Sequence, residues 1–144
     1  VIAISGQPMS VLQREMAGEA LKYDIHKVII SPEPRSILHE RIAQRFDLML
    51  QAGFIEELKS LYLQPDLTAD MPAMRAVGYR QGWQWLAGDL SFEEMREKAI
   101  AATRQLAKRQ LTWLRREGVP IWYDLQAEGS KQKVFAEIGG FLEA

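Results

Sequence analysis

Residues 90–118, LSFEEMREKAIAATRQLAKRQLTWLRREG, decide how the rest of this sequence is interpreted. Ser91 is followed three residues later by Glu94, which is the spacing of a capping box at the start of a helix. Acidic residues occur in the first turns, whereas Arg115 stands near the end and Gly118 follows it, as the helix dipole and the C-cap preference favour. The stretch is therefore predicted to form one long helix.

Six cations gather on one side of this predicted helix. At about 100° per residue they fall into two adjacent wedges, one of Arg104, Lys108 and Arg115 and one of Lys98, Arg109 and Arg116. The apolar residues expected to face the core are Phe92, Met95, Ala99, Leu106, Trp113 and Leu114. A cationic stripe of this length fits a phosphate backbone, although a solvated basic face gives the same pattern.

The formal net charge of −1 hides an uneven distribution. Residues 1–72 hold seven Lys or Arg and ten Asp or Glu, residues 73–116 hold nine and four, and residues 117–144 hold two and five. A basic middle between acidic ends is expected when one face meets a polyanion. Fluctuation over short windows is the alternative explanation.

Length and composition bound the class of protein. With 144 residues and 47% hydrophobic content, the chain has the size of one domain that can bury a core. It has no cysteine, which excludes disulfides and favours a reducing compartment, and His26 and His39 are too far apart for an HExxH pair. No apolar run has membrane-spanning length, so we expect a cytoplasmic protein away from membranes. Because the chain starts at Val1 and not at Met, we expect it to be part of a longer protein.

The remaining segments predict an α/β protein that is mostly helical. Residues 27–31 and 119–124, KVIIS and VPIWYD, are typical of short, fully buried strands of a parallel sheet, which needs further strands as neighbours. Helical spacing and stop signals predict further helices over residues 38–49, 54–63, 70–88 and 133–142, with Gly53 and Gly88 ending the first and third.

Arg41 and Arg45 stand one helical turn apart, at the edge of the apolar stripe in residues 38–49. Two arginines in this arrangement can clamp a diphosphate bidentately. Ion pairs with the neighbouring Glu40 or Asp47 are the alternative.

Arg75 and Arg80 flank Gly78 within the stretch RAVGYRQGWQW. A glycine there lets a phosphate or a ribose approach the backbone. Trp83 and Trp85 cannot share a helical face, so one is expected to pack inward and the other to border a ligand surface or a neighbouring element. Packing at the core or its boundary is the alternative for both.

Three longer stretches carry a family resemblance. They are MPAMRAVGYRQGWQWLAGDLSFEEM, ATRQLAKRQLTWLRREGVPIWYD and RIAQRFDLMLQAGFIEELKSL. Together they resemble the C-terminal half of the bacterial tRNA dimethylallyltransferases, also called tRNA isopentenyltransferases, and the similarity runs in order over residues 1–124. The resemblance implies that residues 1–144 are the C-terminal part of the prenyltransferase core domain. It also implies that the two short strands belong to a P-loop-type parallel sheet.

The resemblance implies transfer of a dimethylallyl group from dimethylallyl diphosphate to the exocyclic amine of the adenosine 3′ of the anticodon. The partners would be a tRNA anticodon stem-loop and the diphosphate, with Mg²⁺ as cofactor and its ligands outside this chain. The positions that match the family's tRNA-contacting stretches are Arg75, Ala76, Val77, Gly78, Tyr79, Arg80, Lys108, Arg109, Gln110, Leu111, Thr112, Trp113, Leu114 and Arg115. Arg45 matches the catalytic arginine at the diphosphate, and Arg41 is a candidate second contact.

Two of the family's motifs are absent from this sequence. It has no G-x-x-x-x-G-K-[ST] phosphate loop and no Asp-Ser-x-Gln segment, which carries the family's proposed base. We therefore expect the chain by itself to be inactive, and to be a monomer. The alternatives are a non-catalytic RNA-binding module, an adenylate isopentenyltransferase that uses a free nucleotide, and a helix-turn-helix DNA reader, which would need a short recognition helix.

Overall fold

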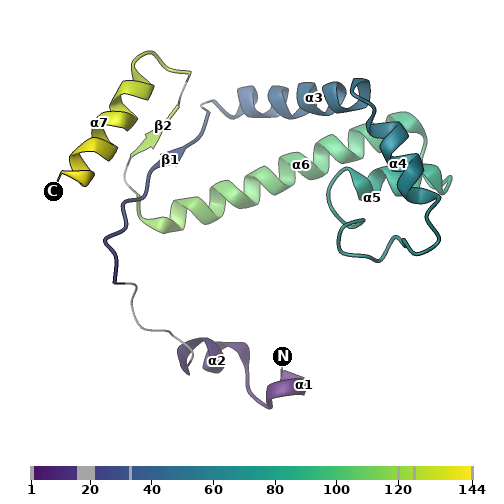
Figure 1. Ribbon diagram of the computed structural model, residues 1–144, viewed down its shortest axis with the longest axis horizontal. Coiled ribbons are helices and arrows are strands. Elements are labelled where there is room, and N and C mark those ends of the chain that lie inside the picture. Colours follow the sequence, from purple (N-terminus) through teal and green to yellow (C-terminus); the bar gives the residue numbers. More distant parts are fainter. Residues whose placement is uncertain (1, 16–21, 33, 120, 125, 144) are drawn as a thin grey trace.

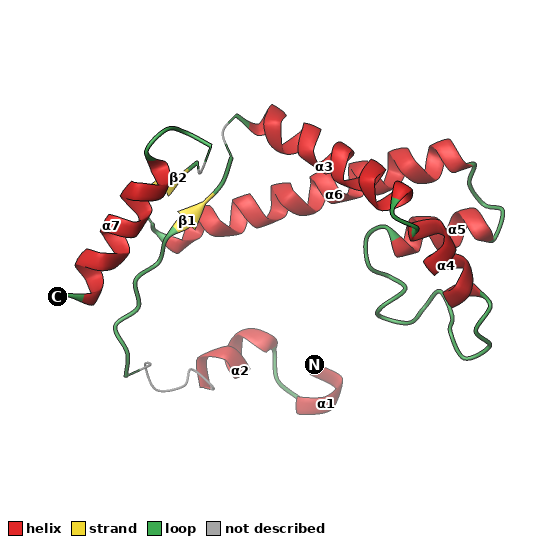
Figure 2. Ribbon diagram, turned by 45° about the horizontal axis from the view of Figure 1, so that its top comes forward, coloured by secondary structure: helices red, strands yellow, loops and turns green. Residues whose placement is uncertain are grey.

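The chain folds as a mostly helical body with a two-stranded sheet at one end (Figure 1). The computed structural model describes residues 2–15, 22–32, 34–119, 121–124 and 126–143. Its elements are α1 (Ile2–Ser5), α2 (Met9–Glu15), β1 (Ile29–Ile30), α3 (Arg35–Gln51), α4 (Phe54–Tyr62), α5 (Tyr79–Leu86), α6 (Phe92–Leu114), a 3-10 turn (Arg115–Glu117), β2 (Trp122–Tyr123) and α7 (Ser130–Leu142). In both views α1 and α2 lie apart from the body formed by α3 to α6 (Figures 1 and 2).

The longest helix, α6, lies against α3 and α5. Its capping box is formed as predicted, because the Glu94 backbone N–H donates to Ser91 Oγ at 3.2 Å and the Ser91 N–H donates to Glu94 Oε2 at 2.8 Å. After the 3-10 turn, Gly118 adopts the left-handed conformation with φ 70° and stops the helix. The prediction of one long helix that ends at this glycine is confirmed.

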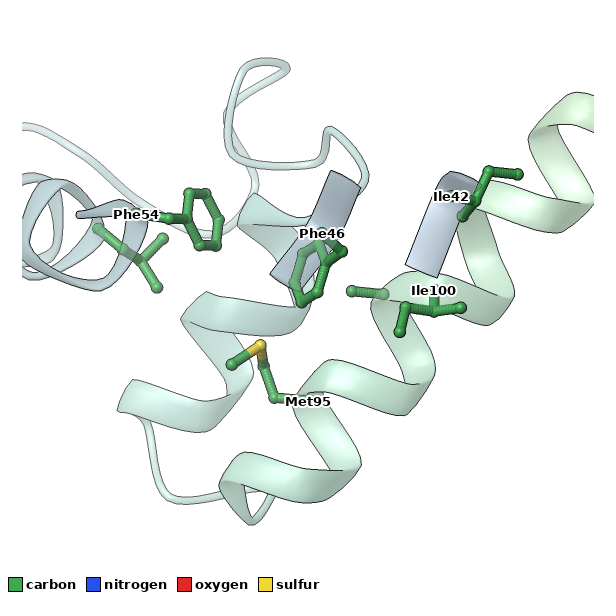
Figure 3. Packing of buried hydrophobic residues seen from close by; sticks show 7 residues of the cluster. Ile42, Phe46, Phe54, Met95 and Ile100 are labelled. Carbon is green, nitrogen blue, oxygen red and sulfur yellow. The ribbon is translucent and has the colours of Figure 1, made fainter. Parts of the chain in front are cut away.

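The hydrophobic core lies between α3, α4 and the first half of α6 (Figure 3). Its buried members are Ile42, Phe46, Phe54, Leu58, Met95, Ala99 and Ile100. Leu58 and Met95 have no exposed surface at all. Burial of a large apolar side chain contributes about 1.5–3 kcal/mol, so this cluster is the main source of stability that fixes α6 relative to α3.

α5 begins later than the sequence predicts. The helix expected from Asp70 starts at Tyr79, because Gly78 has φ 96°, a conformation that a right-handed helix cannot contain. The Gly78 N–H donates to the side-chain Oε1 of the buried Gln81 at 2.9 Å and so caps the new start. One turn further, a Cβ on Gly82 would lie 2.3 Å from Leu58 Cδ2, so α4 and α5 approach closely only because this residue is glycine.

β1 and β2 pair in parallel, with Ile29 opposite Trp122, which confirms the two predicted strands. The prediction that they are fully buried is wrong. Ile29 is 6% exposed, but Ile30 is 50% exposed and Ile121, just before β2, is 51% exposed. The described residues supply no third strand, and a two-stranded sheet leaves one edge and part of its faces open.

α7 is held to the sheet by a small polar cluster. Glu137 accepts a hydrogen bond from the Tyr123 hydroxyl and lies 2.7 Å from His26 Nε2, while His26 stacks on Phe141 with ring centroids 5.0 Å apart. The hydrogen bond from Tyr123, followed by the contacts with His26, lowers the pKa of Glu137 below its usual value of 4.5. His26 therefore has a structural role.

Several apolar residues of α6 are more exposed than the sequence predicts. Met95 and Ala99 are buried as predicted, but Trp113 is 61% exposed and Leu106 and Phe92 are each 38% exposed. The prediction that these three are buried in the core is wrong. Trp113 lies on the side of α6 that lines a hollow with Lys108 and Arg109, Leu106 lines an open hollow beside α3, and Phe92 is the first residue of the helix. Leu114 is half-buried.

Candidate nucleic-acid interface

The exposed half of α6 carries a shallow basic groove. A hollow of about 550 Å³ is lined by Gln105, Lys108, Arg109, Thr112, Trp113 and Arg116. Cations of this kind bind phosphates, and an exposed tryptophan ring offers a stacking surface for an unpaired base. The arrangement therefore suits a nucleic-acid strand with exposed bases.

The groove continues toward α5. A second hollow of about 400 Å³ is lined by Arg80, Gln81, Gln84, Lys98, Ala101, Ala102 and Gln105. Gln105 belongs to both hollows, so the stretch that ends at Arg80 and the stretch that begins at Lys108 meet along one face of α6. We call Arg80, Lys98, Gln105, Lys108, Arg109 and Arg116, together with Thr112 and Trp113, the α6 groove.

The other residues matched to tRNA contact lie around the groove. Arg75 and Ala76 are exposed in the turns before α5, and Gln110 is exposed on α6. Tyr79 is half-buried, and its hydroxyl donates to Glu57 Oε1 at 2.5 Å, a bond that raises the pKa of Tyr79 above its usual value. Leu111 and Leu114 are half-buried.

The structure brings Arg45 of α3 beside the turn before α5. A hollow of about 300 Å³ is lined by Ile42, Arg45, Phe46, Met49, Val77, Gly78, Thr103 and Leu106. The residue matched to the diphosphate and two residues matched to tRNA therefore border one space, although some thirty positions separate them in the sequence. Arg41 is exposed one turn earlier on α3 and does not line this space.

The ion pairs considered for Arg41 and Arg45 do not form. Asp47 instead accepts two hydrogen bonds from Arg96 of α6, at 2.6 Å from Nε and 2.7 Å from Nη2. The hydrogen bonds from Arg96 lower the pKa of the Asp47 carboxyl below its usual value. Within the ranges that the structure describes, neither Arg41 nor Arg45 has an acidic partner, so both charges are available to an anion.

The structure gives Gly78 a conformational role at the start of α5. A Cβ at this position would lie 3.7 Å from Phe54 Cζ and 3.9 Å from Phe46 Cε2, so the missing side chain faces the rings of the core. The positive φ accounts for the glycine, because a Cβ there would make only ordinary contacts with these rings, and Gly78 also lines the Arg45 hollow.

Arg104 departs from the predicted cationic face. It is half-buried and turned toward α3, where its Nη2 donates to the His39 carbonyl oxygen at 3.4 Å. Its buried Nε has no hydrogen-bond partner among the described residues. The expectation that six cations share one surface is wrong for Arg104, because α3 runs alongside that side of α6.

Trp83 and Trp85 take different faces of α5, as predicted. Trp83 packs on Tyr62 of α4, with ring centroids 4.7 Å apart, and Trp85 packs on Phe92 of α6, with centroids 5.7 Å apart. Both are half-buried, so each borders a neighbouring helix.

Gln105 and Arg116 line the groove but are absent from the residues matched to tRNA contact. Arg116 belongs to the second cationic wedge, so the sequence predicts its place on this face. Gln105 carries no charge. Its helical angle, which lies between the two wedges and close to Thr112, is the only feature of the sequence that places it on this face.

The described part of the chain contains no group of three His, Asp or Glu side chains that could hold a metal ion. Over the same residues, no helix has the length and apolar character needed to cross a membrane.

The sequence of this chain matches that of known proteins. Residues 1–117 match the family model of IPP transferase. The chain is 52% identical over 124 residues to the tRNA dimethylallyltransferase of Coxiella burnetii (strain CbuG_Q212), covering 86% of this chain and 41% of that protein. It is 44% identical over 138 residues to the tRNA dimethylallyltransferase of Nitrosococcus oceani, covering 96% and 44%. The chain thus spans about two fifths of the length of these relatives.

Two solved structures are similar in fold. The full-length tRNA isopentenylpyrophosphate transferase of Bacillus halodurans matches with a TM-score of 0.72 and 32% identity, over 81% of this chain and 39% of that chain. The tRNA delta(2)-isopentenylpyrophosphate transferase of Staphylococcus epidermidis matches with a TM-score of 0.73 and 25% identity, over 96% and 45%. The fold of this chain is therefore similar to that of part of each of these two proteins.

Proposed function

This chain belongs to the IPP transferase family, and from this we propose that it carries the tRNA-binding surface and part of the diphosphate site of a tRNA dimethylallyltransferase. The whole enzyme transfers a dimethylallyl group from dimethylallyl diphosphate to the exocyclic amine of the adenosine 3′ of the anticodon. In this reaction the amine nitrogen bonds to the allylic carbon, and the diphosphate leaves with the electron pair of the C–O bond. One amine proton passes to a base, whose motif is absent from this sequence.

The observation that carries the proposal is the continuity of the α6 groove. Arg80 and Lys98 at one end, and Lys108 and Arg109 at the other, line hollows that share Gln105. An adenosine must leave its stack before its amine can react, which requires a hold on the flanking phosphates. The groove supplies cations for the phosphates, and Trp113 supplies a ring on which a loop base can stack.

Arg45 is proposed to serve the diphosphate. It has no acidic partner among the described residues, and it borders the hollow that also contains Val77 and Gly78. Negative charge accumulates on the departing diphosphate as the allylic bond breaks, so a fixed guanidinium there stabilises the transition state electrostatically. Arg41, exposed one turn away, is proposed as a secondary contact.

The strand pair is proposed to belong to a P-loop-type sheet, and residues 1–144 to the C-terminal part of the core domain. The motifs for the phosphate loop and the base are absent from this sequence, so we expect the 144-residue chain to bind RNA without turnover. The long groove argues against a transferase that acts on a free nucleotide, because such a substrate has one nucleotide's phosphates to hold.

Alanine substitutions in the whole enzyme test the diphosphate assignment and the tRNA assignment separately. Arg45→Ala is expected to lower kcat by about a hundredfold with RNA affinity retained, because it removes charge stabilisation at the leaving group. Lys108→Ala with Arg115→Ala is expected to weaken RNA binding and to flatten its salt dependence by about one unit per lost phosphate contact.

Lys59→Ala, which removes an exposed cation of α4 outside the groove, is the matched control and is expected to change neither quantity. The assignment is overturned if Arg45→Ala weakens RNA binding while the double variant binds RNA normally.

A further inference from the structure

Gln81 is a buried polar residue that follows directly on the stretch matched to tRNA contact. It lies on the first turn of α5 and is 4% exposed. It belongs neither to the matched residues nor to the α6 groove as defined above. Burial of an amide side chain costs free energy that a hydrogen bond offsets. The bond that Gln81 makes therefore indicates what the residue does.

The bond of Gln81 stabilises the turn that precedes α5. Its side-chain Oε1 accepts a hydrogen bond from the Gly78 backbone N–H at 2.9 Å. Gly78 is itself buried, and its φ of 96° lies outside the helical range. A buried backbone N–H without an acceptor is unfavourable. Gln81 therefore stabilises this conformation of the turn by supplying the acceptor.

The packing of α5 on α4 fixes the position of Gln81. The next residue, Gly82, lies so close to α4 that a Cβ on it would be 2.3 Å from Leu58 Cδ2, and Leu58 has no exposed surface. The Gly82 N–H also donates to the Gly78 carbonyl oxygen at 2.9 Å. Both the N–H and the carbonyl group of Gly78 are thus bonded to consecutive residues of a helix that packs closely on the core.

The turn at Gly78 borders both parts of the proposed site. Val77 and Gly78 line the hollow that contains Arg45. Arg80 and Gln81 line the hollow at the α5 end of the α6 groove. The conformation at Gly78 therefore determines how the Arg45 hollow and the groove are placed relative to each other.

We propose that Gln81 is a positioning residue, which holds the turn at Gly78 so that Arg80 reaches an RNA phosphate while Val77 and Gly78 border the diphosphate. The inference rests on the proposed function, because it requires the two substrates at these two hollows. Gln81 acts through the Gly78 N–H, and no substrate contact is assigned to it. Removal of its acceptor should therefore weaken both sites although every cation remains.

Two variants of the whole enzyme separate the hydrogen bond from the shape of the side chain. Gln81→Met keeps an unbranched side chain of similar length and removes the oxygen acceptor, whereas Gln81→Glu keeps an oxygen that accepts from the Gly78 N–H. Gln51→Met, at the exposed end of α3, is the matched control. Hydrogen exchange of the segment that contains Gly78 should become faster in Gln81→Met and remain unchanged in the other two variants.

Anticodon stem-loop affinity and kcat at saturating RNA are the functional readouts, measured below the unfolding temperature of every variant. Gln81→Met should weaken RNA affinity at least about fivefold and should lower kcat, because a buried hydrogen bond that orders the turn is lost. Gln81→Glu should keep kcat within about twofold of the wild type, since the acceptor remains. The comparison uses kcat at saturating RNA because the added negative charge itself weakens RNA binding.

A double-mutant cycle shows whether Gln81 acts through the turn. Arg80→Ala removes the cation that the turn places in the hollow beside the groove. If Gln81 positions Arg80, Gln81→Met should weaken RNA binding in the wild type but by less than about twofold in the Arg80→Ala background. A general loss of structure would instead weaken binding equally in both backgrounds.

The outcomes distinguish this proposal from the proposed function. The positioning role is overturned if Gln81→Met matches the wild type in exchange, RNA affinity and kcat, or if its loss of affinity is the same in both backgrounds. In either case RNA binding by the wild type, weakened in Lys108→Ala with Arg115→Ala, leaves the proposed function standing. If the wild type does not bind the stem-loop at low salt, the proposed function is contradicted and the positioning role falls with it.

Discussion

The two halves of α6 share one helical pattern and differ in what covers them. In residues 92–103 the side chains of Met95, Ala99 and Ile100 are buried against α3, α4 and α5. In residues 104–114 the apolar Trp113 is 61% exposed, beside cations that line a groove. Apolar side chains of one helix therefore build the core in one half and remain exposed beside cations in the other, according to which side of α6 the other helices cover.

The cations of the two halves differ in whether they have an acidic partner. Arg96 makes two hydrogen bonds to Asp47 of α3 and so joins two helices. Lys108 and Arg109 are exposed and have no acidic partner among the described residues. A paired cation supports the fold, whereas an unpaired cation on an exposed face remains available to phosphate.

The largest effect is expected from removing a side chain of the buried half. Met95→Ala should lower the free energy of unfolding by about 2–5 kcal/mol, because it leaves a cavity in a fully buried site. Trp113→Ala in the exposed half should change it by only about 0.5 kcal/mol. Urea denaturation of both variants measures the difference, and an equal loss of stability would contradict the division of α6.

A smaller loss of stability is expected from a substitution at the contact between α4 and α5. Gly82→Ala should cost about 1–3 kcal/mol, because the new Cβ would lie 2.3 Å from Leu58 Cδ2 and must displace it. Gly139→Ala on α7 is the control, since a Cβ there meets nothing within 4 Å and helix propensity favours alanine. Thermal unfolding checks the pair, and a neutral Gly82→Ala would show that the helices separate easily.

The smallest effect is expected from the ion pair and depends on pH. The hydrogen bonds from Arg96 lower the pKa of Asp47 below its usual 3.8. A lowered carboxyl pKa stabilises the fold above the unfolded value and loses this contribution as the pH falls through the folded value. Asp47→Asn should therefore be less stable than the wild type at neutral pH, and the gap should close below pH 3.8. A gap that stays constant down to strongly acid pH would show that the charge of Asp47 contributes nothing.

Local signals predicted the ends of helices well. Ser91 with Glu94, Gly53 and Gly118 mark helix boundaries in the sequence, and each lies at one in the structure. These signals depend on hydrogen bonds and backbone angles within a few residues. The start of α5 was missed, because the local sequence does not show that Gly78 adopts a positive φ.

Features that depend on distant segments could not be predicted. The exposure of Trp113 depends on which side of α6 the other helices cover, and the pairing of Arg96 with Asp47 joins residues 49 positions apart. The cationic wedges predicted the exposed Lys108, Arg109 and Arg116, but not that α3 would cover Arg104.

Titration of the 144-residue chain with an anticodon stem-loop at several salt concentrations tests the central claim most directly. If the exposed half of α6 binds the RNA backbone, affinity should fall steeply with salt. Lys108→Ala with Arg109→Ala should then reduce the slope of log K against log salt by about two units, while Lys59→Ala leaves it unchanged. A slope that is the same in the wild type and in both variants, or the absence of binding at low salt, would contradict the account.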